Sequence, residues 1–258
     1  MSSWLATKAP VRFNELLLPD AVKSTIERTA VQANPPHLLL SGPPGVGKTA
    51  AWRLIARQVL GPAWEARTHV LQARDLARTS GAMSKFEEFL RPEGSSSSDT
   101  LAGRTSLDAY DAAFSGTAAT TPAPAGKEST PATHQGRAPV SRLIVIEDAD
   151  HLGTIRQSYL RRMMESASGS ARFMFTTQPP SRVIEALRSR TQHIRLPPPS
   201  RKEIEARLAT IVEEEQIDVA RGVLGDISHI ANGNLRKAIF VTELLGHRSM
   251  LSDRKNLQ

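Results

Sequence analysis

Residues 42–49 read GPPGVGKT and match the spacing G-x-x-x-x-G-K-[ST] at every fixed position. Glycines at this spacing let backbone N–H groups turn inward around an anion. Lys48 is placed to reach the outer phosphates of a nucleotide, and the Thr49 hydroxyl is placed to hold Mg²⁺. The pattern predicts a phosphate-binding site made of Gly42, Pro43, Pro44, Gly45, Val46, Gly47, Lys48, Thr49 and Ala50.

The segments on either side of this loop favour phosphate binding over a chance glycine turn. An apolar run at 37–40 leads in and is typical of a short buried strand. A helix-compatible stretch at 50–60 leads out and stops at Gly61-Pro62, a pair that commonly ends helices. A strand, a glycine loop and a helix N-terminus together form a geometry that binds phosphate, since the helix dipole adds positive potential there.

A second set of acidic residues follows a buried strand further along the chain. Residues 143–146 read LIVI, as expected for a strand buried on both faces, and Glu147 and Asp148 come directly after them. A nucleotide-hydrolysing site needs one acid that holds Mg²⁺ through water and another that orients or deprotonates the attacking water. The alternative is a strand end with solvated acids, and the phosphate loop upstream makes the functional interpretation the better one.

The remaining pattern alternates strands with helices, which predicts an α/β fold with a parallel sheet between helices. A first helix is expected at 20–33, with Asp20 as its cap. The other elements expected in this first domain are strands at 69–73, 173–177 and 192–196 and helices at 155–167 and 183–187.

We place a domain boundary at Pro197-Pro198-Pro199, between an α/β domain at 1–196 and a small helical domain at 197–258. Ser200 to Glu203 forms a predicted capping box at the start of the second domain. Residues 94–139 are rich in Ser, Thr, Ala, Gly and Pro, and we interpret them as a flexible insertion in the first domain. Within it, Leu107, Tyr110 and Phe114 have the spacing of a short helix.

Bulk composition narrows the function classes. The chain has 258 residues and no cysteine, which excludes disulfides and thiolate metal sites. No signal peptide and no apolar run of membrane-spanning length is visible, so we expect a soluble, intracellular protein, cytoplasmic if prokaryotic and nuclear if eukaryotic. The net charge of +7 favours an anionic partner such as nucleic acid, although a merely soluble basic surface is the alternative.

Several motifs in the same order make the chain similar to the small subunit of replication factor C, the clamp loader within the AAA+ ATPases. The resemblance covers most of the chain. It includes the opening around Trp4 and Pro10 and the run at 36–40 before the phosphate loop. The other matching segments are the helix at 160–165 (LRRMME), the finger segment at 187–190 (LRSR) and the sensor-2 segment at 233–238 (GNLRKA).

The resemblance implies roles for residues that spacing alone does not assign. It implies that Arg190 is an arginine finger for the nucleotide of a neighbouring subunit and that Arg236 is the sensor-2 arginine. Gln178 occupies the sensor-1 position, with Thr177 as a competing candidate, and Arg182 is implied to contact the DNA backbone. Without the resemblance, each of the three arginines is a solvated surface residue and Gln178 simply begins a turn.

The resemblance also implies that a segment between the two nucleotide motifs contacts the sliding clamp. The candidate residues have helical spacing, for which core packing is the favoured alternative. They are Met83, Phe86, Phe89 and Leu90.

The chain departs from the family in three places. The family's acidic pair runs Asp then Glu, whereas here Glu147 precedes Asp148, so each carboxylate is displaced by roughly 1–1.5 Å and hydrolysis is expected to be slow. Residues 6–9 (ATKA) replace the family's Glu-Lys-Tyr-Arg, which weakens the expected contacts on the adenine side. We also expect no counterpart here of the helical collar domain that follows the lid in the family.

The resulting hypothesis is an AAA+ α/β domain followed by a helical lid, with ATP and Mg²⁺ bound between them. The chain would act with other clamp-loader subunits to open a sliding clamp and load it on primed DNA. Asp148, Glu147 and Arg190 would carry the chemistry, with Thr49 and Glu147 serving the metal. The alternatives are a catalytically silent scaffold subunit of the same kind of complex and another AAA+ DNA-processing ATPase.

Overall fold

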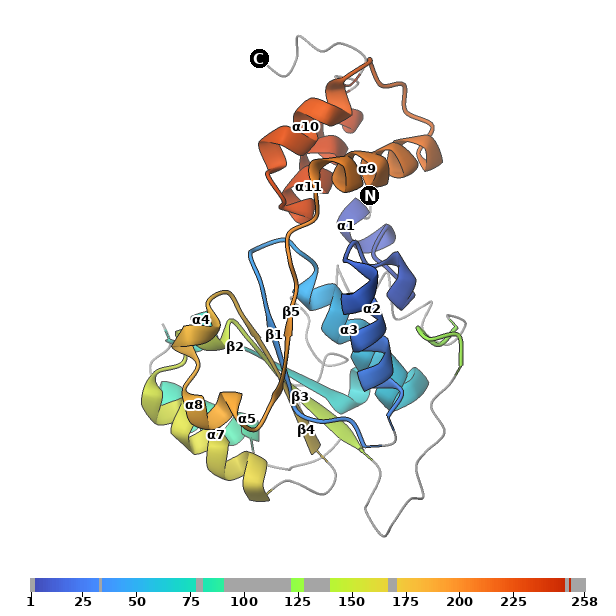
Figure 1. The fold of residues 1–258 in the computed structure, drawn as a ribbon. Coiled ribbons are helices and arrows are strands. Elements are labelled where there is room, and N and C mark those ends of the chain that lie inside the picture. Colours follow the sequence, from blue (N-terminus) through green and yellow to red (C-terminus); the bar gives the residue numbers. More distant parts are fainter. Residues whose placement is uncertain are drawn as a thin grey trace.

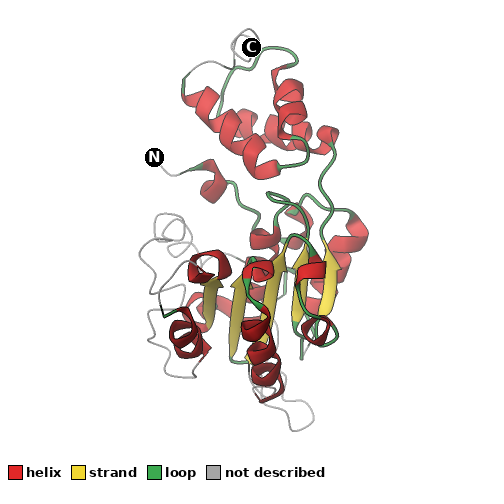
Figure 2. Cartoon of the chain, turned by 90° about the vertical axis from the view of Figure 1, so that its left-hand side faces the viewer, coloured by secondary structure: helices red, strands yellow, loops and turns green. Residues whose placement is uncertain are grey.

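A parallel sheet flanked by helices forms the body of the protein, and a separate group of helices lies beyond one end of the sheet (Figure 1; Figure 2). The structure, a computed structural model, describes residues 3–32, 34–77, 81–90, 122–127, 140–166, 171–248 and 251. Within these residues the sheet has five strands in the order β2-β3-β4-β1-β5. Their bounds are β1 Leu38–Ser41, β2 Thr68–Gln72, β3 Arg142–Glu147, β4 Ala171–Thr177 and β5 Gln192–Arg195.

The strand register brings the functional segments to one edge of the sheet. All paired strands are parallel, so their carboxyl ends meet at the same edge. Gln72 at the end of β2 lies opposite Glu147 at the end of β3. Ser41, directly before the phosphate loop, lies opposite Thr177 at the end of β4. The fold therefore places the loop, both acids and Gln178 together.

Helices cover the two faces of the sheet with separate cores (Figure 1). Helices α2 (Asp20–Ala30) and α3 (Lys48–Leu60) cover one face, where alternate strand residues such as Leu38, Leu40 and Val145 meet Trp52. The other face carries Leu39, Ile146 and Phe175. It is covered by α4 (Ala73–Ala77), α5 (Ala82–Leu90), α7 (Thr154–Ser166) and α8 (Glu185–Arg188). Burial on both faces explains the continuous apolar runs in the sequence.

The α/β alternation predicted from the sequence is confirmed, with small shifts in the element ends. The predicted role of Asp20 as a helix cap is wrong, because Pro19 is the N-cap residue of α2 and no side chain caps that end. Asp20 is instead the first helical residue and pairs with Lys23 at 2.8 Å.

The candidate clamp contacts on α5 are buried in the core. Phe86, Phe89 and Leu90 are at most 6% exposed, and Met83 packs against the same cluster. Core packing, the alternative interpretation of this stripe, is therefore the one that the structure supports. The short helix proposed around Leu107 to Phe114 lies outside the described residues, as does most of the segment at 94–139.

Residues 122–127, which fall inside that segment, pack against the α/β domain. The Gln58 side chain on α3 accepts a hydrogen bond from the Ala125 N–H at 2.9 Å and donates one to the Lys127 carbonyl at 2.8 Å. The Phe13 N–H donates to the Pro124 carbonyl at 3.3 Å. Ala123 is 4% exposed, so this short stretch is fixed on the domain surface.

The lid consists of α9 (Arg201–Glu214), α10 (Val223–Ala231) and α11 (Leu235–His247) (Figure 1). The predicted capping box is present: the Glu203 N–H donates to Ser200 Oγ at 3.3 Å, and the Ser200 N–H donates to Glu203 Oε2 at 2.7 Å. Hydrogen bonding to the side chain and then to the backbone N–H of Ser200 lowers the pKa of the Glu203 carboxyl.

A short helix early in the chain, α1 (Trp4–Thr7), packs in the lid rather than on the sheet. Trp4 is 4% exposed in the core of the lid, and its backbone N–H donates to Glu243 Oε1 of α11 at 2.9 Å. Lys8 pairs with Glu214, the last residue of α9, at 3.1 Å and with Glu215, its C-cap residue, at 2.6 Å. The chain thus passes from the lid down to the α/β domain after this helix.

None of the helices in the described ranges has both the length and the apolar character needed to cross a membrane.

Candidate nucleotide-binding site

A cavity of about 540 Å³ opens at the carboxyl edge of the sheet, beneath the lid. Its walls come from the phosphate loop and α3, the ends of β2, β3 and β4, and the start of α11. The predicted site residues that line it are Pro44, Gly45, Gly47, Lys48, Thr49, Glu147, Asp148, Gln178 and Arg236. Residues that were not predicted also line it: Leu5, Trp52, Arg53, Val70, Gln72, Arg74 and Thr176.

The phosphate loop has the backbone geometry that its glycines predict. Gly45 and Gly47 have φ angles of +74° and +98°, which residues with side chains rarely adopt. Lys48 begins α3, and its Nζ donates to the carbonyl oxygens of Gly42 at 2.7 Å and Pro43 at 2.9 Å. Burial lowers the pKa of the Lys48 amine, an effect that Asp148 partly opposes. The loop is therefore preformed around its lysine.

The lid contacts this loop directly at Gly45. A side chain at position 45 would overlap the lid, because its Cβ would lie 1.8 Å from Asn234 Oδ1. Asn234 also caps α11, accepting a hydrogen bond from the Lys237 N–H at 2.9 Å. The Arg236 N–H lies 3.4 Å from the Gly45 carbonyl oxygen. Glycine at position 45 is thus required by its backbone angle and by the nearness of the lid.

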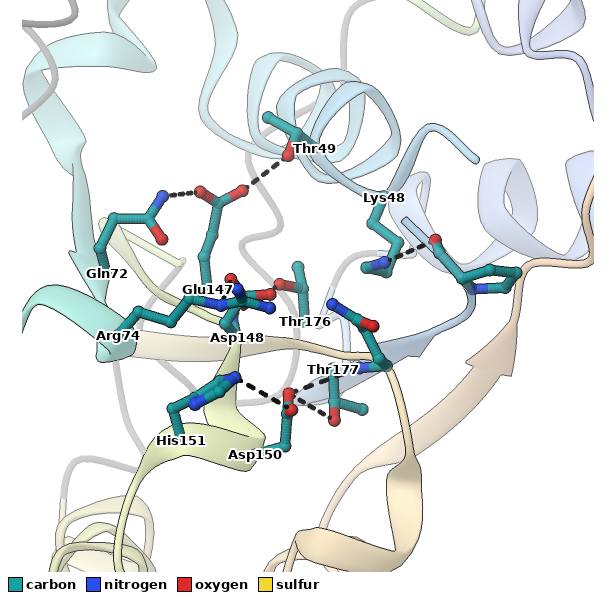
Figure 3. A network of polar contacts seen from close by, with 12 residues as sticks. Lys48, Thr49, Gln72, Arg74, Glu147, Asp148, Asp150, His151, Thr176 and Thr177 are labelled. Atoms are coloured by element: carbon teal, nitrogen blue, oxygen red, sulfur yellow. Dashed lines mark hydrogen bonds and ion pairs between the residues drawn. The ribbon is translucent and has the colours of Figure 1, made fainter. Parts of the chain in front are cut away.

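Glu147 occupies the centre of the site and accepts hydrogen bonds from three side chains, two of which, Thr49 and Gln72, are drawn in Figure 3. Thr49 Oγ1 donates to its Oε1 at 2.7 Å, and Trp52 Nε1 donates to the same oxygen at 2.8 Å. The Gln72 side-chain amide donates to Oε2. The pairing of Thr49 with Glu147 brings together the two residues predicted to serve the metal.

Asp148 is held in an unusual conformation beside an arginine. Its φ and ψ angles of 53° and 46° lie in the left-handed region, and its N–H donates to Thr176 Oγ1 at 3.1 Å. Its Oδ2 pairs with Arg74 Nε at 2.7 Å (Figure 3). The predicted water-orienting acid is therefore engaged with a cation of the same chain.

The two candidates for the sensor-1 position both contact Asp150. Thr177 is fully buried, and its hydroxyl donates to Asp150 Oδ1 at 3.0 Å (Figure 3). Gln178 lines the cavity, while its backbone N–H donates to the same Asp150 oxygen at 3.4 Å. Of the two residues, Gln178 is the one that lines the cavity, and Thr177 bonds to Asp150 at the end of β4.

The three arginines implied by the resemblance lie in different places. Arg236 lines the cavity of its own chain. Arg190 does not line it and is exposed after α8, where its Nη2 pairs with Glu165 of α7 at 2.6 Å. Glu165 thus orients the Arg190 guanidinium on a surface away from the chain's own site. Arg182 lies in a short turn before α8, and the structure brings it to neither cavity.

A smaller cavity of about 110 Å³ adjoins the phosphate loop on the side of the lid. Val46 and Ala50, two predicted phosphate-loop residues, line this cavity. Its other walls are largely apolar and include Pro10, Leu16, Leu17, Leu235 and Ile239. An apolar slot beside a phosphate loop suits the nucleoside part of a nucleotide. Lys8, Ala9 and Pro10 thus line the site although residues 6–9 depart from the family pattern.

The oxygen ligands present fit Mg²⁺. A hydroxyl and a carboxylate lie side by side at Thr49 and Glu147, and hard oxygen ligands are those that Mg²⁺ prefers. Among the described residues no group of three or more His, Cys, Asp or Glu side chains forms a metal site by itself. The ion therefore needs substrate phosphates and water to complete its shell, as is usual for Mg²⁺ in nucleotide sites.

The lining residues that were not identified from the sequence include Gln72, Arg74, Trp52 and Arg53. Gln72 ends β2 and Arg74 follows it, and the sequence of this strand carries no nucleotide motif. Trp52 and Arg53 lie one turn into α3, in a stretch that reads as an ordinary helix. The position of Trp52 three residues after Thr49 is the one available signal, because such residues share a helix face.

The fold and the site define a P-loop nucleotide-binding protein with a parallel α/β domain and a helical lid. Residues 38–198 match the family described as "ATPase family associated with various cellular activities (AAA)". The chain belongs to this AAA family of ATPases.

Curated relatives are named replication factor C small subunits. The subunit 2 of Pyrobaculum aerophilum is 29% identical over 92% of this chain and 61% of its own length. The subunit of Methanosarcina mazei is 30% identical over 92% of this chain and 58% of its own length. The chain thus spans about three fifths of the length of these relatives.

Solved structures of the Thermotoga maritima RuvB Holliday junction branch migration motor resemble the fold. One has a TM-score of 0.63 at 16% identity, covering 96% of this chain and 70% of its own. At this identity the likeness establishes the shared fold alone.

Proposed function

We propose that this chain is an ATP-binding subunit of a sliding-clamp loader of the replication factor C kind. Its partners would be other clamp-loader subunits, a sliding clamp and primed DNA, with Arg182 contacting the DNA backbone, and its location would be intracellular. The relatives named replication factor C small subunits support this proposal. The RuvB likeness favours no branch-migration function, since it concerns the fold.

The placement of Arg190 is the observation that carries the proposal of action between subunits. Its guanidinium is oriented by Glu165 on the outer surface and lies outside the cavity of its own chain. A cation held there serves a nucleotide bound by a neighbouring subunit, where it neutralises charge that develops on the phosphates.

Each side chain of the site has a role in this proposal. The phosphate loop and Lys48 hold the phosphates, Thr49 and Glu147 face the metal, and Arg236 links the lid to the nucleotide. Bound Mg²⁺ would neutralise phosphate charge. Asp148 would orient the attacking water, and Gln178 would contact that water or the outer phosphate.

The test is the ATPase rate of the purified chain, alone and with sliding clamp, primed DNA and companion subunits. We expect stimulation in the full mixture and its loss in Arg190→Ala, which removes the guanidinium that serves the neighbouring site. The control is Arg201→Ala, an exposed lid arginine with no assigned role. Stimulation that survives Arg190→Ala would contradict the proposed role of the finger, and failure to bind ATP would contradict the function as a whole.

The contact between Arg74 and Asp148 favours a second candidate, a subunit whose own site binds ATP but hydrolyses it slowly or not at all. Asp148 is shorter than the glutamate expected there and is engaged by Arg74. Exchanging the acids, with Glu147→Asp and Asp148→Glu together, should raise turnover if the site is only detuned. No gain would favour the scaffold function.

A further inference from the structure

Trp52 directs its single polar atom at Glu147. The residue is 1% exposed, and its ring packs in the core between α3 and the sheet. Its indole Nε1 donates to Glu147 Oε1 at 2.8 Å. Because close packing fixes the ring, the direction of this N–H is fixed as well. A buried tryptophan needs a partner for this group, and here the partner is the acid at the centre of the nucleotide site.

Gln72 approaches the same carboxylate from the opposite side. It ends β2 directly opposite Glu147 in the parallel register, and its amide donates to Oε2 (Figure 3). Thr49 shares Oε1 with Trp52. The three donors come from α3 and β2, which are rigid elements of the domain, so the carboxylate is held on both of its oxygens.

The three hydrogen bonds restrict a glutamate side chain that is longer than the aspartate found at this position in the family. A longer side chain has one more rotatable bond and therefore more orientations to lose. Two neutral donors remove this freedom without cancelling the negative charge that attracts a cation. A carboxylate has about four lone-pair sites, and the three donors leave room for a further contact, such as a metal-bound water.

We propose that Trp52 and Gln72 are positioning residues that set the Mg²⁺ affinity of the nucleotide-bound site by holding the Glu147 carboxylate against Thr49. This inference rests on the proposed ATP-binding function and deepens it. Both residues line the cavity, and the role proposed for them is exerted through their hydrogen bonds to Glu147. Groups that orient metal-facing side chains change metal affinity by roughly 10- to 100-fold when they are removed.

The main variant is Trp52→Phe, which keeps an aromatic ring and removes the N–H. Calorimetry gives the Kd for ADP with excess EDTA and with saturating Mg²⁺. The Kd with EDTA divided by the Kd with Mg²⁺ measures the metal-dependent part of binding. We expect this ratio to fall by about tenfold in Trp52→Phe. In Gln72→Leu, which tests the same carboxylate independently, we expect a fall in the same direction. ADP avoids turnover during the titration.

The matched control is Trp64→Phe, since Trp64 packs in the same core at 5% exposure and does not line the cavity. Its ratio should equal that of the unaltered chain. Mn²⁺ binding to the protein–ADP complex, followed by electron paramagnetic resonance, should show the same loss in Trp52→Phe and Gln72→Leu. This readout does not depend on activity.

If the role of Trp52 were purely structural, its substitution would raise both Kd values by the same factor and leave their ratio unchanged. An unchanged ratio in both test variants would overturn the inference. In a Glu147→Ala background, Trp52→Phe should have no further effect on the ratio. A further fall there would show that Trp52 acts by another route and would also overturn it. Absence of ADP and ATP binding under both conditions would refute the proposed function itself, which distinguishes the two failures.

Discussion

Replacing Arg74 with methionine should speed ATP hydrolysis at this chain's own site. Arg74 Nε lies 2.7 Å from Asp148 Oδ2, so the acid predicted to orient water is held by a charged hydrogen bond. The two side chains are 45% and 25% exposed, which limits the contact to the range of surface ion pairs, about 0.5–1 kcal/mol. If the contact must break before Asp148 meets the water, its removal should raise kcat about two- to fivefold.

The assay is single-turnover hydrolysis at saturating ATP in the assembled complex, with the neighbouring sites inactivated, so that only this site reports. Methionine keeps the aliphatic length of Arg74, and Arg67→Met is the control because that exposed arginine does not line the cavity. The kcat of Arg74→Lys should lie between those of the unaltered chain and Arg74→Met, since lysine keeps the charge and loses the planar donor group. A lower kcat in Arg74→Met would refute the reasoning and assign Arg74 to the stabilisation of the phosphates.

Three further predictions concern the frame around the site. Burial lowers the pKa of His37 to about 4, and its Nδ1 accepts a hydrogen bond from the Phe173 N–H, so protonation favours the unfolded chain. The contribution of neutral His37 to the free energy of unfolding is fully present above pH 6.5 and should fall by up to about 3 kcal/mol as the pH drops to 4. Urea unfolding of His37→Asn should depend less on pH over this range. Gln157 of α7 is 2% exposed and donates to the Leu152 carbonyl before that helix. It also donates to the Arg182 carbonyl and accepts from the Ile184 N–H, which links α7 to the segment before Arg190. Gln157→Leu should cost about 2–4 kcal/mol in urea unfolding, and a loss below about 1 kcal/mol would contradict these bonds. Gly45→Ala should weaken ATP binding in calorimetry, and adding Asn234→Gly should restore only part of the affinity, because the strain of the φ angle at residue 45 persists.

The α/β fold was predictable because its signals are local. The run at 143–146 is buried on both faces of the sheet, and Ser200 with Glu203 forms the capping box that its spacing predicts. The phosphate loop was equally predictable from the sequence, since Gly42, Gly47 and Lys48 have fixed positions in one short pattern. Such features depend on neighbours a few residues away.

The missed site residues depend on contacts between distant segments. Gln72 and Glu147 are 75 positions apart in the sequence, and they meet only because β2 pairs with β3. The same pairing brings Arg74 to Asp148. Trp52 reads as a core residue, which it is, and its second role appears only when Glu147 is placed beside it. The helix α1 was missed because four residues carry too little periodicity, and its stability comes from packing on the lid.

The packing of α1 in the lid means that the polypeptide crosses between the two domains twice, once after Lys8 and once around Pro197. A line can be drawn through these two connecting segments, and rotation of the lid about that line is the motion that stretches neither segment. Opening and closing would then reduce to a single angular coordinate. Because the sequence contains no cysteine, a pair of spin labels on introduced cysteines, one on each side of the line, would follow that angle without background.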